Sequence, residues 1–132
     1  MKYLLDTCTV SDFVQGQTNV LARIKAVAPP SLAVSVLTRM EVAYGLALYP
    51  ERARKLESVL DALFSAIVTL PLDTPDALAA AAVRATLRRE GRPIGPYDVL
   101  IAGTALARGL IVVTSNLGEF QRIGGLQVEN WR

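Results

Sequence analysis

The segment that decides the fold is residues 94–114, which read Ile-Gly-Pro-Tyr-Asp-Val-Leu-Ile-Ala-Gly-Thr-Ala-Leu-Ala-Arg-Gly-Leu-Ile-Val-Val-Thr. Pro96 stands where a first helical residue is expected, and Gly109 is a typical helix stop. The run from Leu110 to Val113 then has the length and apolar character of a buried strand. Because apolar residues cover nearly every side of the helix, we expect it to lie between a sheet and another layer or another subunit.

The same alternation of strand and helix extends to both ends of the chain. Short apolar runs typical of strands occur at residues 2–5, 32–36, 68–72 and, more weakly, 126–128. The segments between them carry apolar residues at helical spacing. Strands that alternate with helices favour right-handed crossovers and a parallel sheet. The predicted fold class is therefore α/β, with a central, mostly parallel sheet of four to five strands.

The composition restricts the chemistry and the setting. The 132 residues fit a single domain spanning 1–132, and the net charge of +2 permits a nucleic-acid partner without demanding one. The chain contains no histidine and a single cysteine, Cys8, which excludes His-based catalysis and His- or Cys-rich zinc sites. An active site must then use oxygen ligands, which favour Mg²⁺ or Mn²⁺. Without a signal peptide or a membrane-spanning segment, we expect a cytoplasmic protein.

Acidic and amide side chains follow several of the predicted strands. Asp6 directly follows the first strand, Glu41 lies one turn into the helix after the second, and Asn116 and Glu119 follow the fourth. Ligands of parallel sheets bind beyond the carboxyl ends of the strands, so these residues should share one edge. Asp98 would lie at the opposite edge if its helix were a simple crossover, and the topology alone does not bring it to the others.

Each acid also has an ordinary structural explanation. Asp6 could only cap a helix, Glu41 could be a partly exposed helical acid, and Asp98 could complement its helix dipole. Carboxylates held within a few ångströms of one another repel, and a divalent cation would neutralise them. If the three acids lie together, a shared cation explains the cluster.

Four motifs together resemble a known family. They are Leu-Leu-Asp-Thr-Cys at residues 4–8, Ser-Val-Leu-Thr-Arg-Met-Glu at 35–41, Gly-Pro-Tyr-Asp-Val-Leu-Ile-Ala at 95–102 and Val-Thr-Ser-Asn-Leu-Gly-Glu-Phe at 113–120. Their order and spacing look like those of PIN-domain ribonucleases, specifically the VapC-type toxins of type II toxin-antitoxin systems. The resemblance covers nearly the whole chain.

This resemblance implies an α/β/α sandwich in which Asp98 reaches the same edge as Asp6 and Glu41. These three carboxylates would hold Mg²⁺ or Mn²⁺, and Thr114 would orient a water or a neighbouring carboxylate. A metal-activated water would cleave RNA and leave 5′-phosphate and 3′-hydroxyl ends. Many members carry Asn where this chain has Cys8 and Asp where it has Asn116. The fourth corner would then be either weaker or assisted by Glu119 or a water.

The resemblance also implies partners. They are a cognate VapB-like antitoxin that blocks the site, an RNA substrate for which transfer RNA is the first expectation, and a second copy in a homodimer built on helices. Arg84, Arg88 and Arg92, spaced by four, could track phosphates or could simply be a solvated face. Thr7 could cap the first helix or support the site.

Three other functions stay open from the residues. An Asp after the first strand and a Thr after a later one also fit a HAD-like phosphohydrolase with Asp6 as nucleophile, or a phospho-receiver module. Both would expect further acids near Asp6 and a late lysine, whereas the lysines are Lys2, Lys25 and Lys55. An RNA-binding PIN-like domain with a weakened metal site is the third possibility, because Asn116 carries no charge.

Overall fold

The computed structural model describes all 132 residues and contains one five-stranded sheet, in which every pair of neighbouring strands is parallel. The strand order is β3-β2-β1-β4-β5, with β1 at the centre. The predicted α/β class and parallel sheet are confirmed. In chain order, the elements are β1 (Tyr3–Leu5), α1 (Thr7–Val14), α2 (Thr18–Ala26), the 3-10 turn η1 (Pro29–Ser31), β2 (Leu32–Ser35), α3 (Val36–Leu48), α4 (Pro50–Ala66), β3 (Val68–Leu70), α5 (Thr74–Arg89), α6 (Pro96–Arg108), β4 (Ile111–Val113), α7 (Leu117–Phe120) and β5 (Val128–Glu129).

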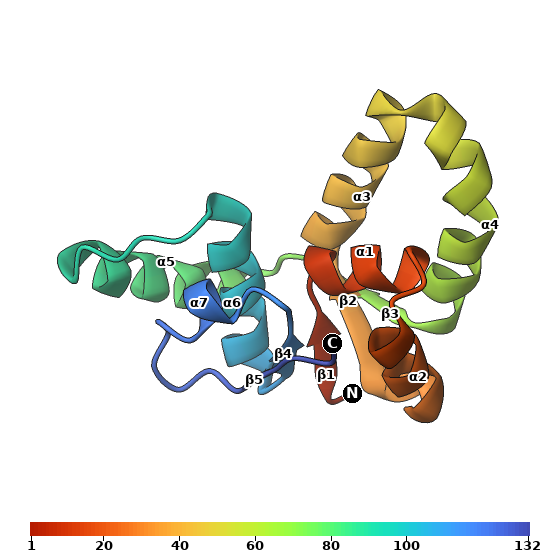
Figure 1. Cartoon of the computed structure of the whole chain (residues 1–132). Helices are drawn as coiled ribbons and strands as arrows, with labels where there is room; N and C mark the ends of the chain where they lie inside the picture. Colours follow the sequence, from red (N-terminus) through yellow and green to blue (C-terminus); the bar gives the residue numbers. More distant parts are fainter.

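The sheet is covered on both faces, which gives the three-layer arrangement seen in Figure 1. Side chains alternate along each strand, so Tyr3 and Leu5 of β1 enter one core while Leu4 enters the other. The first core packs against α1, α2 and α4 and includes Trp131, whose ring meets Tyr3 edge to face at 4.9 Å. The second core packs against α5, α6 and α7. Both faces of every central strand are therefore buried, as expected for a parallel sheet.

Helix α6 begins at Pro96 and is followed by Gly109 in the left-handed conformation, as predicted from the sequence. The layer that covers α6 on its outer side is α5, not a second subunit. The helices approach so closely that a Cβ on Gly103 would lie 2.6 Å from the Cβ of Ala80. Across the same interface the buried Asp76 accepts two hydrogen bonds from Arg108, at 3.2 and 2.9 Å.

The position of Asp98 corrects one expectation. A helix that leads into a parallel strand runs against that strand, because it must return the chain from the carboxyl edge to the amino edge of the sheet. The first turn of α6 therefore lies at the carboxyl edge, and Asp98 lies there with it. The prediction that a simple crossover would place Asp98 at the opposite edge was wrong for this reason.

Smaller differences concern the ends of elements. The predicted polar turn after β4 contains the short helix α7, and the last strand covers Val128–Glu129 rather than residues 126–128. Strand β3 stops at Leu70, two residues before its predicted end.

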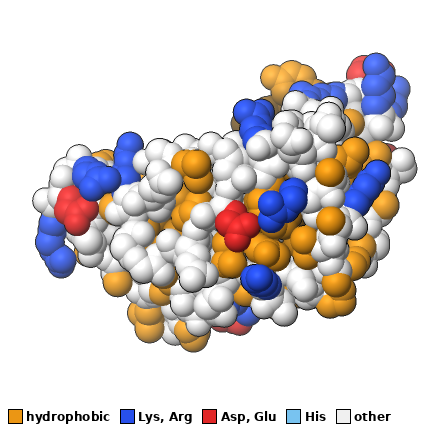
Figure 2. All heavy atoms as spheres, turned by 60° about the horizontal axis from the view of Figure 1, so that its bottom comes forward, with side chains coloured by type: hydrophobic (Ala, Val, Ile, Leu, Met, Phe, Trp, Pro, Cys, Tyr) orange, Lys and Arg blue, Asp and Glu red, His pale blue; other side chains and the backbone are white.

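No helix has both the length and the apolar character that crossing a bilayer would require. On the face shown in Figure 2, basic side chains are scattered among hydrophobic ones and form no continuous band.

Candidate active site

Asp6 marks the centre of the site, at the carboxyl end of the central strand. It is 2% exposed and caps α1, with its Oδ1 accepting a hydrogen bond of 2.9 Å from the backbone N–H of Thr9. Asp6 is therefore a helix cap as well as a candidate ligand. Thr7 is the first residue of α1 and does not cap it, which corrects the expectation of a cap at Thr7.

Asp6 lies where the order in which the chain adds strands to the sheet reverses. Successive strands run from β1 outward to β3, and the chain then returns to place β4 on the other side of β1. Such a switch point is where open parallel sheets bind ligands. The buried Thr114 follows β4 here, and its hydroxyl accepts the backbone N–H of Asn116 at 2.9 Å. The Thr114 hydroxyl also acts to lower the pKa of Asp6, so the two side chains are neighbours.

Glu41 is held by the neighbouring helix α1. The Thr7 hydroxyl lies 2.7 Å from Glu41 Oε1, to which it donates, and 3.2 Å from the hydroxyl of Thr38. Thr38 is completely buried one turn before Glu41 in α3. Sequence reasoning missed Thr38, although its spacing of three from Glu41 places both side chains on one helix face.

Asp98 meets the residues that follow β4. After burial, Glu119 is the neighbour that contributes most to the raised pKa of Asp98. Glu119 is in turn held by Asn116, whose Nδ2 donates to Oε2 at 3.0 Å. Asn116 and Glu119, both predicted site residues, therefore act as a connected pair. The Asn116 amide nitrogen is the donor in this bond, so the Asn116 carbonyl oxygen stays free to serve as a ligand.

The charges of these acids act on one another. Burial, then hydrogen bonding and repulsion from Glu119, then repulsion from Asp6 and Glu41 raise the pKa of Asp98 to about 7. Burial likewise raises the pKa of Asp6, against the hydrogen bonds from Thr114 and Thr9. The structure therefore brings Asp6, Glu41, Asp98 and Glu119 into one region of negative charge.

Cys8 lies at the edge of this region. Burial, followed by repulsion from Asp6, Asp98, Asp12 and Glu41, raises the pKa of its thiol to about 11. A thiol with such a pKa stays neutral at physiological pH and is a poor nucleophile. Cys8 is therefore a neutral neighbour of the carboxylates when no cation is bound.

The donor set fits a hard divalent cation by its chemistry. It consists of carboxylate, hydroxyl and amide oxygens, the ligands that Mg²⁺ and Mn²⁺ prefer, and its mutual repulsion is the kind that a cation relieves. As the side chains stand, however, no three of them lie close enough together to hold one ion in common. Asp6 is fixed by its cap, so the half-buried Asp98 and Glu119 are the acids that would move toward a bound cation.

Asp12, another acid near the site, has a structural role. Asp12, largely buried in α1, accepts two hydrogen bonds of 3.0 Å from Arg132. Its negative charge still contributes to the raised pKa of Asp6. Because its partner is 120 residues away in sequence, no spacing rule could have found this pair.

The arginines predicted to form one stripe lie in two places. Arg84 and Arg88 line a groove between α5 and α6. Arg92 lies beyond the end of α5, past the left-handed Gly91, and faces Glu90 at 4.0 Å. The prediction of a single helical stripe of three arginines is therefore wrong, although Arg84 and Arg88 do share a surface.

A three-layer parallel α/β fold with carboxylates from separate elements at its switch point defines a class of proteins with an acidic, oxygen-donor site. The PIN domain model matches residues 3–126 of this chain. The chain belongs to the PIN domain family. This membership argues against the alternative in which Asp6 is the nucleophile of a phosphohydrolase.

Relatives match over nearly the full length. The chain is 38% identical over 133 residues to the "tRNA(fMet)-specific endonuclease VapC" of Salmonella typhimurium, covering 99% of this chain and 98% of the relative. It is 36% identical to the protein of the same name from Shigella flexneri, with the same coverage. The resemblance to VapC-type PIN proteins is thereby confirmed.

Solved structures agree. A chain of the DNA-bound VapBC complex of Salmonella typhimurium superposes with a TM-score of 0.91 at 37% identity, covering 100% of this chain and 99% of that one. A chain of VapBC2 from Rickettsia felis, bound to a promoter DNA fragment, also gives 0.91, at 27% identity and full coverage of both. The fold described above is therefore that of VapC proteins.

Proposed function

We propose that this chain is a metal-dependent endoribonuclease, the toxin of a toxin-antitoxin pair. The observation that carries the proposal is the convergence of Asp6, Glu41 and Asp98, from three separate elements, at the switch point of the sheet. Nothing in the packing of the fold requires three acids there, and their repulsion is a cost that a function must offset. Family membership and the nuclease names of its relatives support the same assignment.

Asp6, Asp98 and Glu41 would hold Mg²⁺ or Mn²⁺. Such an ion, when bound, activates a water and stabilises the charge that develops on the scissile phosphate. The protein's own part is positional: the Thr9 N–H fixes Asp6, and Thr7 fixes Glu41. Attack by water does not use the RNA 2′-hydroxyl, so the products would carry 5′-phosphate and 3′-hydroxyl ends.

For the substrate we propose transfer RNA, which the names of the two relatives from Salmonella typhimurium and Shigella flexneri specify for those proteins. For the partner we propose a VapB-like antitoxin, as in the VapBC complexes with similar chains. The surface that supports a protein partner is on α3, where exposed apolar side chains recur every fourth residue, at Val36, Met40, Tyr44 and Leu48. The homodimer stays a prediction.

Sequencing of RNA ends tests the proposal. Induction of the wild type should arrest growth and create new 5′-phosphate ends in transfer RNA, and chelation of divalent cations should stop cleavage by the purified protein. The Asp6→Asn variant should neither arrest growth nor create these ends. Equal toxicity of both proteins, or cyclic-phosphate ends, would contradict the mechanism.

A second candidate is an RNA-binding module that does not cleave. It is favoured by one observation, that the site lacks three acids within reach of one ion and has a neutral Asn116 at its fourth corner. This candidate predicts RNA binding without new ends under any supply of Mg²⁺ or Mn²⁺, and the same experiment separates the two.

A further inference from the structure

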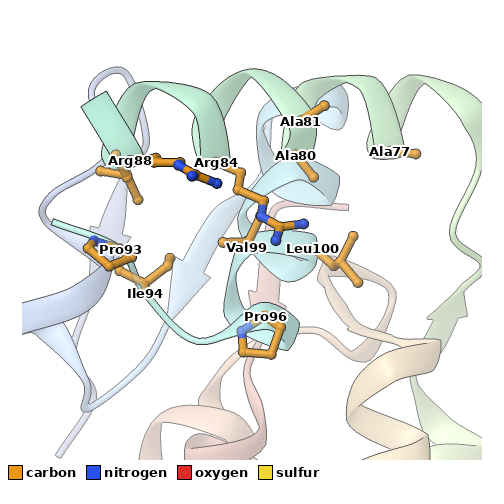
Figure 3. Close-up of a pocket in the computed structure, with 11 residues that line it drawn as sticks. Ala77, Ala80, Ala81, Arg84, Arg88, Pro93, Ile94, Pro96, Val99 and Leu100 are labelled. Carbon is orange, nitrogen blue, oxygen red and sulfur yellow. The ribbon is translucent and has the colours of Figure 1, made fainter. Parts of the chain in front are cut away.

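A groove lies outside the acidic site, between α5, the loop that follows it, and the first turns of α6 (Figure 3). Its volume is about 630 Å³, and its walls are mostly alanine, leucine, valine, isoleucine and proline. The only charged side chains that line it are Arg84 and Arg88. We call it the α5–α6 groove. Since it has an apolar floor, two cations and no acid, it is complementary to an anion with a partly apolar body.

Both guanidinium groups are available to a ligand. Figure 3 shows the side chain of Arg84 reaching from α5 toward Val99 and Leu100, and that of Arg88 extending along the same space. Neither takes part in any ion pair of the molecule. Most other arginines are engaged: Arg108 and Arg132 bind buried aspartates, and Arg39 stacks on Phe64 at 4.2 Å. Arg84 and Arg88 are exposed and unpaired in one groove, so both are free to bind an anion from outside.

The groove adjoins the acidic site through the first turn of α6. Pro96 and Val99 line the groove, and Asp98 lies between them in sequence. Tyr97, in the same turn, is 46% exposed, which leaves its ring free to stack on a base. A nucleic-acid strand in the groove can thus continue across one helical turn to the carboxylates.

An RNA strand at the site also needs positive charge close by. Asp6, Glu41, Asp98 and Glu119 repel phosphates, and a bound cation offsets only part of that charge. Arg84 and Arg88 stand at i and i+4 on α5, about 5–6 Å apart at Cβ, so both can serve one strand. They supply the compensating charge that the site itself lacks.

We propose that the α5–α6 groove is an RNA subsite, in which Arg84 and Arg88 bind phosphates of the single-stranded segment adjoining the cleavage position and Tyr97 stacks on a base between groove and site. This inference rests on the proposed ribonuclease function and adds to it where the strand lies. Arg84 and Arg88 are positioning residues, since they do not reach the reacting phosphate.

The test measures the salt dependence of transfer-RNA binding with Mg²⁺ present, in an Asp98→Asn background that prevents cleavage. Wild-type arginines are compared with R84Q/R88Q, with R84K/R88K, and with R89Q as the matched control. Arg89 is an exposed arginine of the same helix that does not line the groove. Steady-state cleavage is measured with the same substitutions in the otherwise native chain, and thermal unfolding checks that each variant folds.

If the groove binds RNA, R84Q/R88Q weakens binding and lowers the slope of log affinity against log salt by about 1.4, at about 0.7 per phosphate contact on a single strand. KM rises while kcat stays the same, R84K/R88K keeps most of the slope, and R89Q behaves as wild type. A double variant indistinguishable from R89Q in slope and KM overturns the proposal. So does a double variant that keeps its RNA affinity but loses affinity for the antitoxin, because the occupant is then a protein.

Failure of the proposed function looks different. In that case the wild type and Asp6→Asn give the same RNA ends, whatever stands at positions 84 and 88. If the protein cleaves RNA but the groove does not bind it, the wild type still cleaves and the arginine variants are equally active.

Discussion

The hydroxyl of Thr7 donates a hydrogen bond of 2.7 Å to Glu41, and this bond joins the first residue of α1 to the second turn of α3. Thr7 also lies 3.2 Å from the buried Thr38. A carboxylate on an exposed helix face would otherwise sample several rotamers. The bond holds the Glu41 carboxylate beside the start of α1, which Asp6 caps, and this is the role of an outer partner of a metal ligand.

Thr7→Val should therefore lower cleavage by about 10- to 100-fold, the usual cost of losing such a partner, with little change in stability. The replacement keeps the shape of the side chain and removes only the donor. Activity measured against Mg²⁺ concentration should show weaker apparent metal affinity, partly restored at high Mg²⁺. Thr7→Ser, which keeps the hydroxyl, is the control, and equal losses in both variants would assign Thr7 to packing alone.

Asp6 has two roles, and Asp6→Asn separates them. Asn caps helices as well as Asp does, so the hydrogen bond to the Thr9 N–H should survive and the free energy of unfolding should stay within about 1 kcal/mol of wild type. Cleavage should fall by about 100-fold or more, because the charge at the centre of the site is lost. Parallel measurements of unfolding and of cleavage separate the two roles. If Asp6→Asn is still active, capping α1 is the only role of Asp6.

The raised pKa of Asp98 predicts how stability depends on pH without metal. Its value of about 7 in the folded chain, against an ordinary 3.8, means that the folded state holds a proton which the unfolded state releases first. The stability from this group is fully present below about pH 4 and is lost as pH rises through about 7. Mg²⁺ should restore it, and should raise the unfolding temperature more at pH 8 than at pH 5.

Asp98→Asn should remove this pH dependence. The variant should be more stable than wild type at pH 8 in the absence of metal, by about 1 kcal/mol, and inactive at every pH. Urea unfolding at pH 5 and pH 8 measures the difference. A wild type whose stability does not change over this range would show that the acids are too well solvated to interact.

Asn116→Asp tests the neutral corner of the site. The amide of Asn116 now donates to Glu119 at 3.0 Å, and an aspartate would replace that bond with repulsion. Without metal, the variant should unfold more easily at pH 8 and the pKa of Asp98 should rise further. With Mg²⁺, the added charge should tighten binding, as calorimetric titration would show; unchanged affinity would place Asn116 outside the ligand set.

The sequence was sufficient for the parts of the fold that local rules control. Pro96 and Gly109 predicted the ends of α6, and the alternation of elements predicted a parallel sheet, because helix ends and crossovers depend on near neighbours in the chain. The edge at which Asp98 lies was mispredicted because the direction of a crossover helix was misjudged. Thr38 and the pairing of Asn116 with Glu119 depend on side-chain orientation, which spacing alone does not determine.

The close contact of α5 and α6 was equally hidden in the sequence, where Gly103 is one glycine in an apolar helix. In the structure its missing Cβ lets Ala80 and the carbonyl of Asp76 approach, at 2.6 Å from where that Cβ would be. Two of the three nearest atoms belong to the α5 backbone, so no side-chain rotation can make room. The helix pair must then shift as a whole.

Gly103→Ala should for that reason destabilise the fold by about 1–3 kcal/mol, although alanine is the better helix former. Gly45→Ala is the matched control, since Gly45 is also inside a helix, α3, but a Cβ added there would meet nothing within 4 Å. It should stabilise the chain by about 0.5–1 kcal/mol. Urea unfolding of the two variants should give shifts of opposite sign. Because α6 carries both Asp98 and one wall of the α5–α6 groove, Gly103→Ala should also weaken cleavage, while stabilisation by both substitutions would mean that the two helices are free to separate.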